Sequence, residues 1–326
     1  MSEQPVVIPS IAETTERAAQ ILDSVDRAVV GKRHALELVL ATVLAGGHVL
    51  LEDNPGLGKT LAARSLAQTL GLDFARAQFT PDLLPADLTG SFIFDQRTAT
   101  FDFRQGPLFT GLLLADEINR TPPKTQAALL EAMQERQVTV EGQTFRLPHP
   151  FHVIATANPV EYEGTYPLPE AQLDRFLSRV SFGYPTAEEE VDVLLRRMRR
   201  QQEDITLEPV TDAAGLLGMQ AAIEQLVVED SVVDYCVRLA AATRTQAQVL
   251  IGSSPRGSLA LMLVARAFAV VRGRDFVTPE DVKAVAPSVL SHRVTIKPEL
   301  WMSGANASSV IRSVLDNVPA PATAKG

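Results

Sequence analysis

Between a short apolar run at residues 49–51 and a helix-forming segment that begins at Leu61, the chain carries a glycine-rich loop, Asn54-Pro55-Gly56-Leu57-Gly58-Lys59-Thr60. Backbone N–H groups of such a loop can close around phosphate oxygens at the helix N-terminus. Lys59 can reach the β- and γ-phosphates of a nucleotide, and the Thr60 hydroxyl can ligate Mg²⁺. The expected ligand is therefore a nucleoside triphosphate. Its contacts are expected from Pro55, Gly56, Leu57, Gly58, Lys59, Thr60 and Leu61.

The loop departs from the phosphate-loop pattern GxxxxGK[ST] at one position. The pattern places glycine six residues before its lysine, and this chain has Asp53 there. Aspartate tolerates left-handed backbone geometry better than most residues, and the glycines nearest the phosphates are present, so the loop stays feasible. Taken alone, the segment is also compatible with an ordinary glycine-rich turn.

Apolar runs alternate with helical patterns over the first part of the chain. This alternation predicts an α/β fold, with a parallel sheet and helices on both faces. From Thr186 onward the strand signals stop and helices follow: Thr186 and Glu189 form a capping box, and Thr278 precedes a proline at the first helical position. The chain therefore divides near Pro185 into an α/β part and a helical part. The apolar runs span residues 48–52, 74–79, 112–115, 151–156 and 177–182.

Two segments interrupt this rhythm with strict alternation of apolar and polar residues, which is typical of β-hairpins. In the first, Phe92 and Phe94 face Phe101 and Phe103 across a turn at residues 96–99. In the second, Val138 and Val140 are expected to face Phe145 and Leu147 across a turn at residues 141–143. Both are predicted to be inserted hairpins, which either pack against the domain or grip something in a central channel.

Acidic and amide side chains follow two of the predicted strands. The run 112–115 ends in Asp116 and Glu117, and the run 151–156 is followed by Asn158. In a parallel sheet the carboxyl ends of the strands face the ligand, so Asp116 is placed to hold Mg²⁺ and Glu117 to orient and deprotonate water. Asn158 would lie beside Glu117 if the two strands are neighbours, where its carboxamide can fix the water or touch the γ-phosphate.

Positive charge stabilises the departing phosphates in phosphoryl transfer, so arginines near strand ends are candidates for catalysis. Arg175 lies just before the fifth predicted strand and could point into a neighbouring subunit's site. Arg256 opens a helix of the second part and could reach back to the bound nucleotide. Arg179 is a third candidate, although a surface salt bridge explains it equally well.

Charge and cysteine content exclude several classes of protein. The formal net charge of −9 argues against a surface that grips nucleic acid throughout, although a local basic channel remains possible. Cys236 is the single cysteine, so neither an intrachain disulfide nor a cysteine-based metal cluster is expected. No membrane insertion and no signal peptide are expected, and a cytoplasmic location is predicted. The predicted segments are a disordered N-terminus at 1–10, an α/β domain at 11–185, an all-helical domain at 186–318 and a disordered tail at 319–326.

Together these motifs resemble those of an AAA+ ATPase of the MoxR family, over residues of about 12–318. The resemblance implies a P-loop nucleotide-binding domain followed by a helical lid. Its most specific pieces are the loop 54–60, the string Asp116-Glu117-Ile118-Asn119-Arg120, Ala157-Asn158-Pro159, Pro169-Glu170-Ala171-Gln172-Leu173-Asp174-Arg175-Phe176 and residues 252–256.

The resemblance also implies roles for individual residues. Asp116 and Glu117 would be the Walker B acids, and Asn158 would be sensor 1. Arg175 would be the arginine finger and Arg256 sensor 2. Val30 and Gly31 would line the adenine pocket, and the two hairpins would be the helix-2 insert and the pre-sensor-1 hairpin. Family members often carry an acid at the position of Asp53.

The expected activity is Mg²⁺-dependent ATP hydrolysis by a ring, expected to be a hexamer, because an arginine finger that acts on a neighbour is useless in a monomer. The resemblance implies chaperone-like remodelling of a protein client, with a von Willebrand factor A domain protein as partner. Two alternatives remain open. One is a nucleic-acid motor or a chelatase-type subunit, and the other is a nucleotide-gated interaction module with little hydrolysis.

Overall fold

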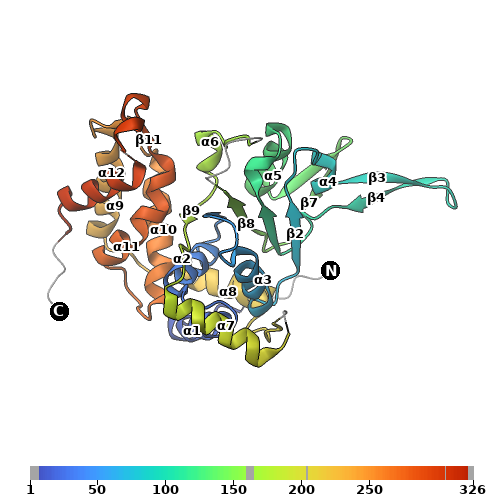
Figure 1. Ribbon diagram of the computed structural model, residues 1–326, viewed down its shortest axis with the longest axis horizontal. Coiled ribbons are helices and arrows are strands. Elements are labelled where there is room, and N and C mark those ends of the chain that lie inside the picture. Colours follow the sequence, from blue (N-terminus) through green and yellow to red (C-terminus); the bar gives the residue numbers. More distant parts are fainter. Residues whose placement is uncertain (1–6, 159–164, 203–204, 305, 322–326) are drawn as a thin grey trace.

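The computed structural model describes residues 7–158, 165–202, 205–304 and 306–321. At its centre is a five-stranded parallel sheet in the order β2-β5-β8-β1-β9 (Figure 1). Each strand coincides with a predicted apolar run to within two residues at either end, so the predicted parallel sheet is confirmed. The strands are β1 (Val49–Glu52), β2 (Phe74–Gln78), β5 (Leu112–Asp116), β8 (His152–Ala157) and β9 (Ser178–Val180).

Alternate residues of the central strands point to opposite faces of the sheet, and each face is buried under helices. Leu112 and Leu114 join an apolar cluster with α1 (Ile11–Asp26), α2 (Arg33–Leu44) and α3 (Lys59–Thr69). Leu113 and Ala115 join a second cluster, which includes residues of α5 (Pro123–Glu135). Because both faces of β5 and β8 are covered, every residue of these two central strands is buried.

Both predicted hairpins are present as antiparallel pairs. The first is formed by β3 (Gly90–Asp95) and β4 (Thr100–Gln105), with the predicted register of Phe92 opposite Phe103 and Phe94 opposite Phe101. It extends well away from the body of the molecule (Figure 1). The second is formed by β6 (Gln137–Val140) and β7 (Gln143–Arg146).

The register of the second hairpin differs from the prediction in one respect. Val138 lies opposite Phe145 as expected, but Val140 lies opposite Gln143, and Leu147 follows the end of β7. The turn is therefore two residues long, Glu141 and Gly142, both with positive φ, at 49° and 80°. Such a left-handed pair closes a hairpin more tightly than the predicted turn of three residues.

The region after Thr186 is helical, as predicted, except for one short two-stranded antiparallel pair. The pair consists of β10 (Val249–Ile251) and β11 (Thr295–Ile296). Its strands are too short to produce a recognisable alternation. The helices of this region are α7 (Ala187–Arg200), α8 (Ala213–Glu224), α9 (Asp230–Arg244), α10 (Pro255–Val271), α11 (Pro279–Leu290), the 3₁₀ turns η2 (Ser291–Arg293) and η3 (Pro298–Ser303), and α12 (Ala307–Asn317).

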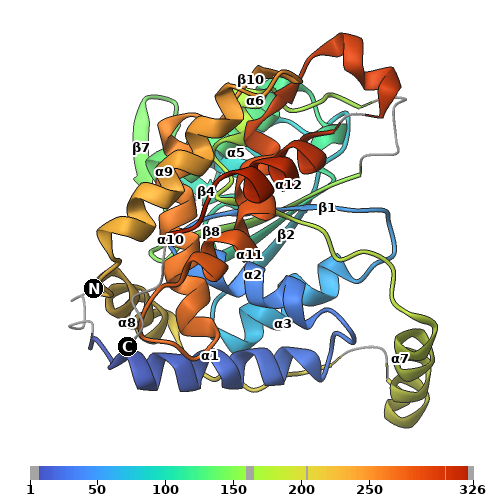
Figure 2. The same cartoon turned by 90° about the vertical axis from the view of Figure 1, so that its left-hand side faces the viewer.

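Helix starts follow the predicted capping chemistry. The Thr186 hydroxyl accepts from the Glu189 N–H at 3.2 Å and begins α7, and Thr278 caps α11 in the same way. α7 has no buried residue and projects from the body of the molecule (Figure 2), and Arg196 joins it to the end of α1 by donating to the Asp26 carbonyl at 2.8 Å. Ser10 lies in the segment predicted to be disordered, yet it caps α1 with a full capping box. Residues 1–6 and 322–326 of the two predicted tails lie outside the described residues.

The helical region packs against the α/β part and shares its core. α10 contacts both α1 and α2, and their buried residues belong to one apolar cluster. No helix among the described residues is long and apolar enough to span a bilayer.

Candidate active site

The glycine-rich loop joins β1 to α3 with an open cradle at the helix N-terminus. Gly56 and Gly58 have φ values of 82° and 80°, a conformation that favours glycine. A Cβ atom added at either position would have no atom within 4 Å, so both residues border empty space. Gly58 is the N-cap of α3 and makes no side-chain cap, which leaves the first N–H groups of the helix to an outside acceptor. The cradle therefore fits a phosphate group.

Lys59 lies at the centre of this cradle. Its Nζ donates to the backbone carbonyl of Asp53 at 2.7 Å. Burial lowers the pKa of Lys59, and the nearby carboxylates of Asp53, Asp116 and Glu117 oppose this effect. The ammonium group thus lies within electrostatic reach of these acids, and a bound phosphate would give it a stronger partner than a carbonyl.

The Asp53 side chain explains the departure from the phosphate-loop pattern. Its carboxylate accepts from the Ser181 hydroxyl at 2.7 Å, from the Gly183 N–H at 3.3 Å and from the Phe182 N–H. Asp53 is 8% exposed. It therefore fastens the start of the phosphate loop to the segment that follows β9, a contact that glycine cannot make.

Replacing Asp53 with glycine is expected to destabilise the fold even though it restores the pattern. The change leaves three donors without their acceptor, of which the Phe182 N–H is buried, and this costs about 1–3 kcal/mol in the free energy of unfolding. Urea denaturation of Asp53→Gly beside Asp53→Asn, which keeps the shape and one acceptor, measures the effect. An unchanged urea midpoint in Asp53→Gly would contradict the structural role of this carboxylate.

Asp116 lies at the carboxyl end of β5, and both of its oxygens have partners. Oδ1 accepts from the Thr156 hydroxyl at 2.6 Å, and Oδ2 accepts from Arg76 at 2.7 and 3.1 Å. Among the described residues no group of three or more His, Cys, Asp or Glu side chains could hold a metal ion alone. The exposed Thr60 hydroxyl and the Asp116 carboxylate instead fit Mg²⁺ that is held jointly with substrate phosphates and water.

Glu117 follows Asp116 and turns out of the strand, with a left-handed backbone at φ 58°. Its N–H donates to the Thr156 hydroxyl at 2.8 Å, so β8 fixes the backbone at this point. The carboxylate Oε2 accepts from the Gln78 amide at 2.7 Å and lies 3.2 Å from Arg120 Nε. The carboxylate is thus held in a fixed direction by β2 and η1 (Ile118–Arg120).

Asn158 follows β8, and β8 pairs directly with β5, as its predicted position beside Glu117 requires. It is 6% exposed. Its backbone carbonyl accepts from the Asn119 amide at 3.1 Å, which ties the residue to the segment after Glu117. Pro159, the last residue of this predicted motif, lies outside the described residues.

Arg175 and Arg256 lie together at the end of the sheet where the strands begin, opposite to the end that carries the phosphate loop. Arg175 precedes β9 at the amino ends of the strands, and its Nε donates to Gln134 at 3.1 Å. Arg256 lies 3.9 Å from the Asp174 carboxylate and is 65% exposed. Both line a cavity of about 240 Å³ with Asp174 and Gln134. The phosphate loop, Asp116 and Glu117 all follow the carboxyl ends of strands, so this chain does not bring Arg175 or Arg256 to its own phosphate cradle.

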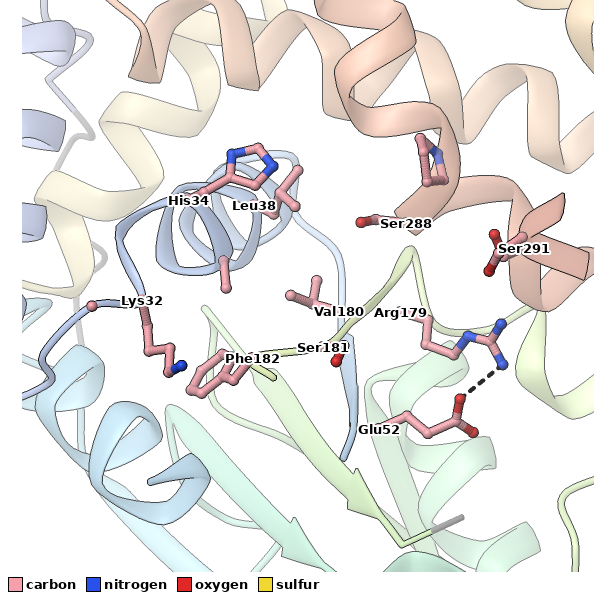
Figure 3. A pocket seen from close by; sticks show the side chains of 14 residues that line it. Lys32, His34, Leu38, Glu52, Arg179, Val180, Ser181, Phe182, Ser288 and Ser291 are labelled. Atoms are coloured by element: carbon pink, nitrogen blue, oxygen red, sulfur yellow. Dashed lines mark ion pairs between the residues drawn. The ribbon is translucent and has the colours of Figure 1, made fainter. Parts of the chain in front are cut away.

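A pocket of about 450 Å³ lies between α2, β9 and α11 (Figure 3). Gly31 and Lys32 line it, whereas Val30, the other residue expected at the adenine, does not. Arg179 points into the pocket and pairs with Glu52 at 3.0 Å, as the salt-bridge interpretation expects, and its catalytic candidacy stays a prediction. Gly31 has a φ of 71°, a left-handed conformation that favours glycine.

Three residues of the site escaped the sequence analysis: Arg76, Gln78 and Thr156. Arg76 and Gln78 alternate on β2 and therefore share a face, and Gln78 lies opposite Asp116 in the register. A charged residue inside β2 was the available signal. It could be interpreted only once β2 was known to neighbour β5.

Comparisons with known proteins agree with this geometry. Residues 48–178 match the family described as "ATPase family associated with various cellular activities (AAA)", and residues 241–314 match the AAA lid domain. The chain is 49% identical to the uncharacterized protein YeaC of Bacillus subtilis over 300 residues, covering 92% of this chain and 93% of that protein. It is 44% identical over 317 residues to the chaperone MoxR1 of Mycobacterium tuberculosis, covering 94% and 82%.

A solved structure shows the same architecture. The crystal structure of a Cytophaga hutchinsonii protein assigned as an ATPase superimposes with a TM-score of 0.89 at 39% identity, covering 96% of this chain and 97% of that one. The phosphate cradle, the acids on β5 and these full-length similarities lead to the same assignment. The chain belongs to the MoxR family of AAA+ ATPases.

Proposed function

We propose that the protein hydrolyses ATP in a ring in which each active site is shared between two neighbouring subunits. One observation carries the proposal: Lys59 and Glu117 lie at the carboxyl edge of the sheet, whereas Arg175 and Arg256 lie together at the amino edge. A head-to-tail arrangement would bring the amino edge of one subunit to the carboxyl edge of the next, and such an interface closes into a ring. A hexamer is the proposed ring.

Each group has a distinct part in the proposed reaction. The cradle N–H groups and Lys59 bind the phosphates, and Thr60 and Asp116 hold Mg²⁺, which supplies charge neutralisation when bound. Glu117 accepts a proton from the attacking water, and Asn158 orients that water. Arg175 of the neighbouring subunit stabilises the charge that develops on the phosphates. Both arginines act on the neighbour in this proposal, because they lie side by side.

Hydrolysis is proposed to drive chaperone-like remodelling of a protein client in the cytoplasm. The name of the Mycobacterium tuberculosis relative supports a chaperone role. The projecting hairpin β3–β4 exposes Phe94 and Phe101, at 48% and 67%, and is available for contact with a client. A von Willebrand factor A domain protein remains the proposed partner by family resemblance alone.

Arg175→Ala tests the shared site. ATP should bind with unchanged affinity, while turnover falls by about 10³-fold or more, the usual contribution of an arginine finger. Mixing Arg175→Ala with Glu117→Gln should restore part of the turnover, because the second subunit donates its intact Arg175 to the intact site of the first. Arg238→Ala is a control, since Arg238 is a surface residue of α9 that pairs with Asp234. Mixtures that stay inactive would count against a shared site.

ATP is also expected to promote assembly, because the nucleotide would lie between subunits. Mass photometry at working concentration should detect monomers without nucleotide and rings with ATP and Mg²⁺. Lys283→Ala, on the surface of α11, should assemble like the unmodified protein. Monomers under both conditions would exclude the ring.

A nucleic-acid motor or a chelatase-type subunit is the second candidate. A nucleic-acid motor predicts that DNA stimulates ATP turnover at moderate salt and that charge reversal in either hairpin removes the stimulation. The net charge of −9 favours the protein client.

A further inference from the structure

The segment that carries Arg175 is held by the lid. This segment, residues 174–177, connects α6 (Glu170–Leu173) to β9. The turn η2, at the end of the lid helix α11, places Arg293 directly against it. The Arg293 side chain is 3% exposed, so its charge is almost completely enclosed by protein.

Arg293 uses all three guanidinium nitrogens on this one segment. Nε donates to the Asp174 carboxylate at 2.7 Å. The two terminal nitrogens donate to the backbone carbonyls of Phe176 at 2.9 Å and Leu177 at 3.2 Å. His292 adds a contact from its Nε2 to the Phe176 carbonyl at 3.0 Å. The contacts lie on both sides of Arg175 in the sequence, so they fix its backbone from before and after.

The first turn of α10 is shaped to admit Arg293. A Cβ atom added at Gly257 would lie 3.3 Å from the Cδ of Arg293 and 1.9 Å from the Ser253 hydroxyl. Arg256, the preceding residue, lies beside the same Asp174 carboxylate. The lid thus presents a buried arginine and an exposed arginine to one acidic residue of the segment.

Arg175 itself depends on this support. Within the part of the chain that the structure describes, the Arg175 side chain makes one hydrogen bond, to Gln134 at the exposed end of α5. One bond to a flexible amide cannot hold a long side chain in a single direction, whereas a fixed backbone restricts where the guanidinium can go. A buried arginine that is hydrogen-bonded to a carboxylate is among the stronger ways to fix a loop.

We propose that Arg293 is the positioning residue for Arg175, and that through it the lid sets whether a subunit can act on its neighbour's nucleotide. The proposal rests on the shared active site proposed above. In each subunit, the lid positions the Arg175 that acts on the nucleotide of the neighbouring subunit. The phosphate cradle of the same subunit is built by other elements, so it should not need Arg293.

Mixed rings distinguish a subunit that fails to supply Arg175 to its neighbour from a subunit that fails to hydrolyse ATP at its own site. Arg293→Lys keeps the positive charge but cannot bond Asp174, Phe176 and Leu177 together. Asp174→Asn keeps the shape and removes the charged acceptor, and it serves as the second variant should Arg293→Lys unfold. For each variant, ATP affinity, turnover alone, and turnover after mixing with Glu117→Gln or with Arg175→Ala are measured.

We expect unchanged ATP affinity and a fall in turnover on the order of 10- to 100-fold, as for a misplaced catalytic group. Glu117→Gln should restore turnover to Arg293→Lys and to Asp174→Asn, since it donates a well-placed Arg175. Mixing with Arg175→Ala should not restore the turnover of either variant, because an Arg175→Ala subunit has no arginine to supply to its neighbour. Arg266→Lys is the matched control: Arg266 is also buried in the lid and pairs with Glu224, yet it does not touch the segment, so its turnover should change little.

Loss of ATP affinity in both variants, or failure of Glu117→Gln to restore either of them, would overturn the proposal, since Arg293 would then serve its own site. The pair Arg175→Ala with Glu117→Gln is the reference. If that pair is also inactive, the shared site itself is wrong; if that pair is active, only the role of Arg293 is wrong.

Discussion

ATP affinity of Lys59→Ala is expected to be lower by about 30- to 4000-fold, the equivalent of about 2–5 kcal/mol. The structure gives the reason. Lys59 is partly buried, its pKa is lowered by burial, and among the described residues its hydrogen-bond acceptor is the Asp53 carbonyl. A triphosphate would replace that neutral acceptor with a charged one, so removing the ammonium leaves the phosphates without their main positive partner.

Isothermal titration with a slowly hydrolysed ATP analogue measures this change. Lys283→Ala, a surface lysine on α11, is the matched control and should bind as the unmodified protein does. Because Lys59 lies at the start of α3 and contributes little to the core, thermal unfolding of Lys59→Ala should stay near that of the control. An ATP affinity of Lys59→Ala equal to that of the control would show that the glycine-rich loop is not the phosphate site.

The fold was predictable where buried apolar residues recur at regular intervals in the sequence. The strand runs were readable because both faces of the sheet are covered, as Leu113 and Leu114 show by belonging to opposite apolar clusters. The first hairpin was readable because four phenylalanines mark one of its faces. The second hairpin was shifted by the Glu141-Gly142 turn, since a polar residue such as Gln143 can occupy a turn or a strand equally well.

The site was predictable only in part, because its chemistry depends on which strands are neighbours. Asp116, Glu117 and Asn158 could be found from their place after apolar runs. Their partners could not, since Arg76 reaches Asp116 only through the pairing of β2 with β5. Sheet order depends on long-range packing and leaves no local signal in the sequence.

The lid held the largest gap between prediction and structure. Arg256 was expected to face the nucleotide of its own subunit, and the structure places it beside Arg175 instead. Its direction depends on how α10 packs on α1 and α2, which no periodicity in α10 specifies. Arg293 had no signal at all, because a buried arginine at a helix end looks like any basic residue that favours the helix dipole.

Turnover of Glu117→Gln is expected to fall by about 10²- to 10⁴-fold, with ATP affinity unchanged. The substitution keeps the size of the side chain and an oxygen that can still accept from Gln78, so the local structure should persist. It removes the ability to take a proton from water. Glu131→Gln, on the exposed side of α5, is the control and should turn over normally. Single-turnover hydrolysis measured beside nucleotide affinity separates the two effects.

This variant also decides between the main proposal and a nucleotide-gated binding module. A motor without its base should remain ATP-bound, so Glu117→Gln should accumulate as assembled rings and retain its protein client in a pull-down. In a module that hydrolyses little, Glu117 has no proton to accept, and the two proteins should turn over at the same slow rate. Equal turnover would therefore remove the motor interpretation, whereas a large loss of turnover would require Glu117 to act on the water during the reaction.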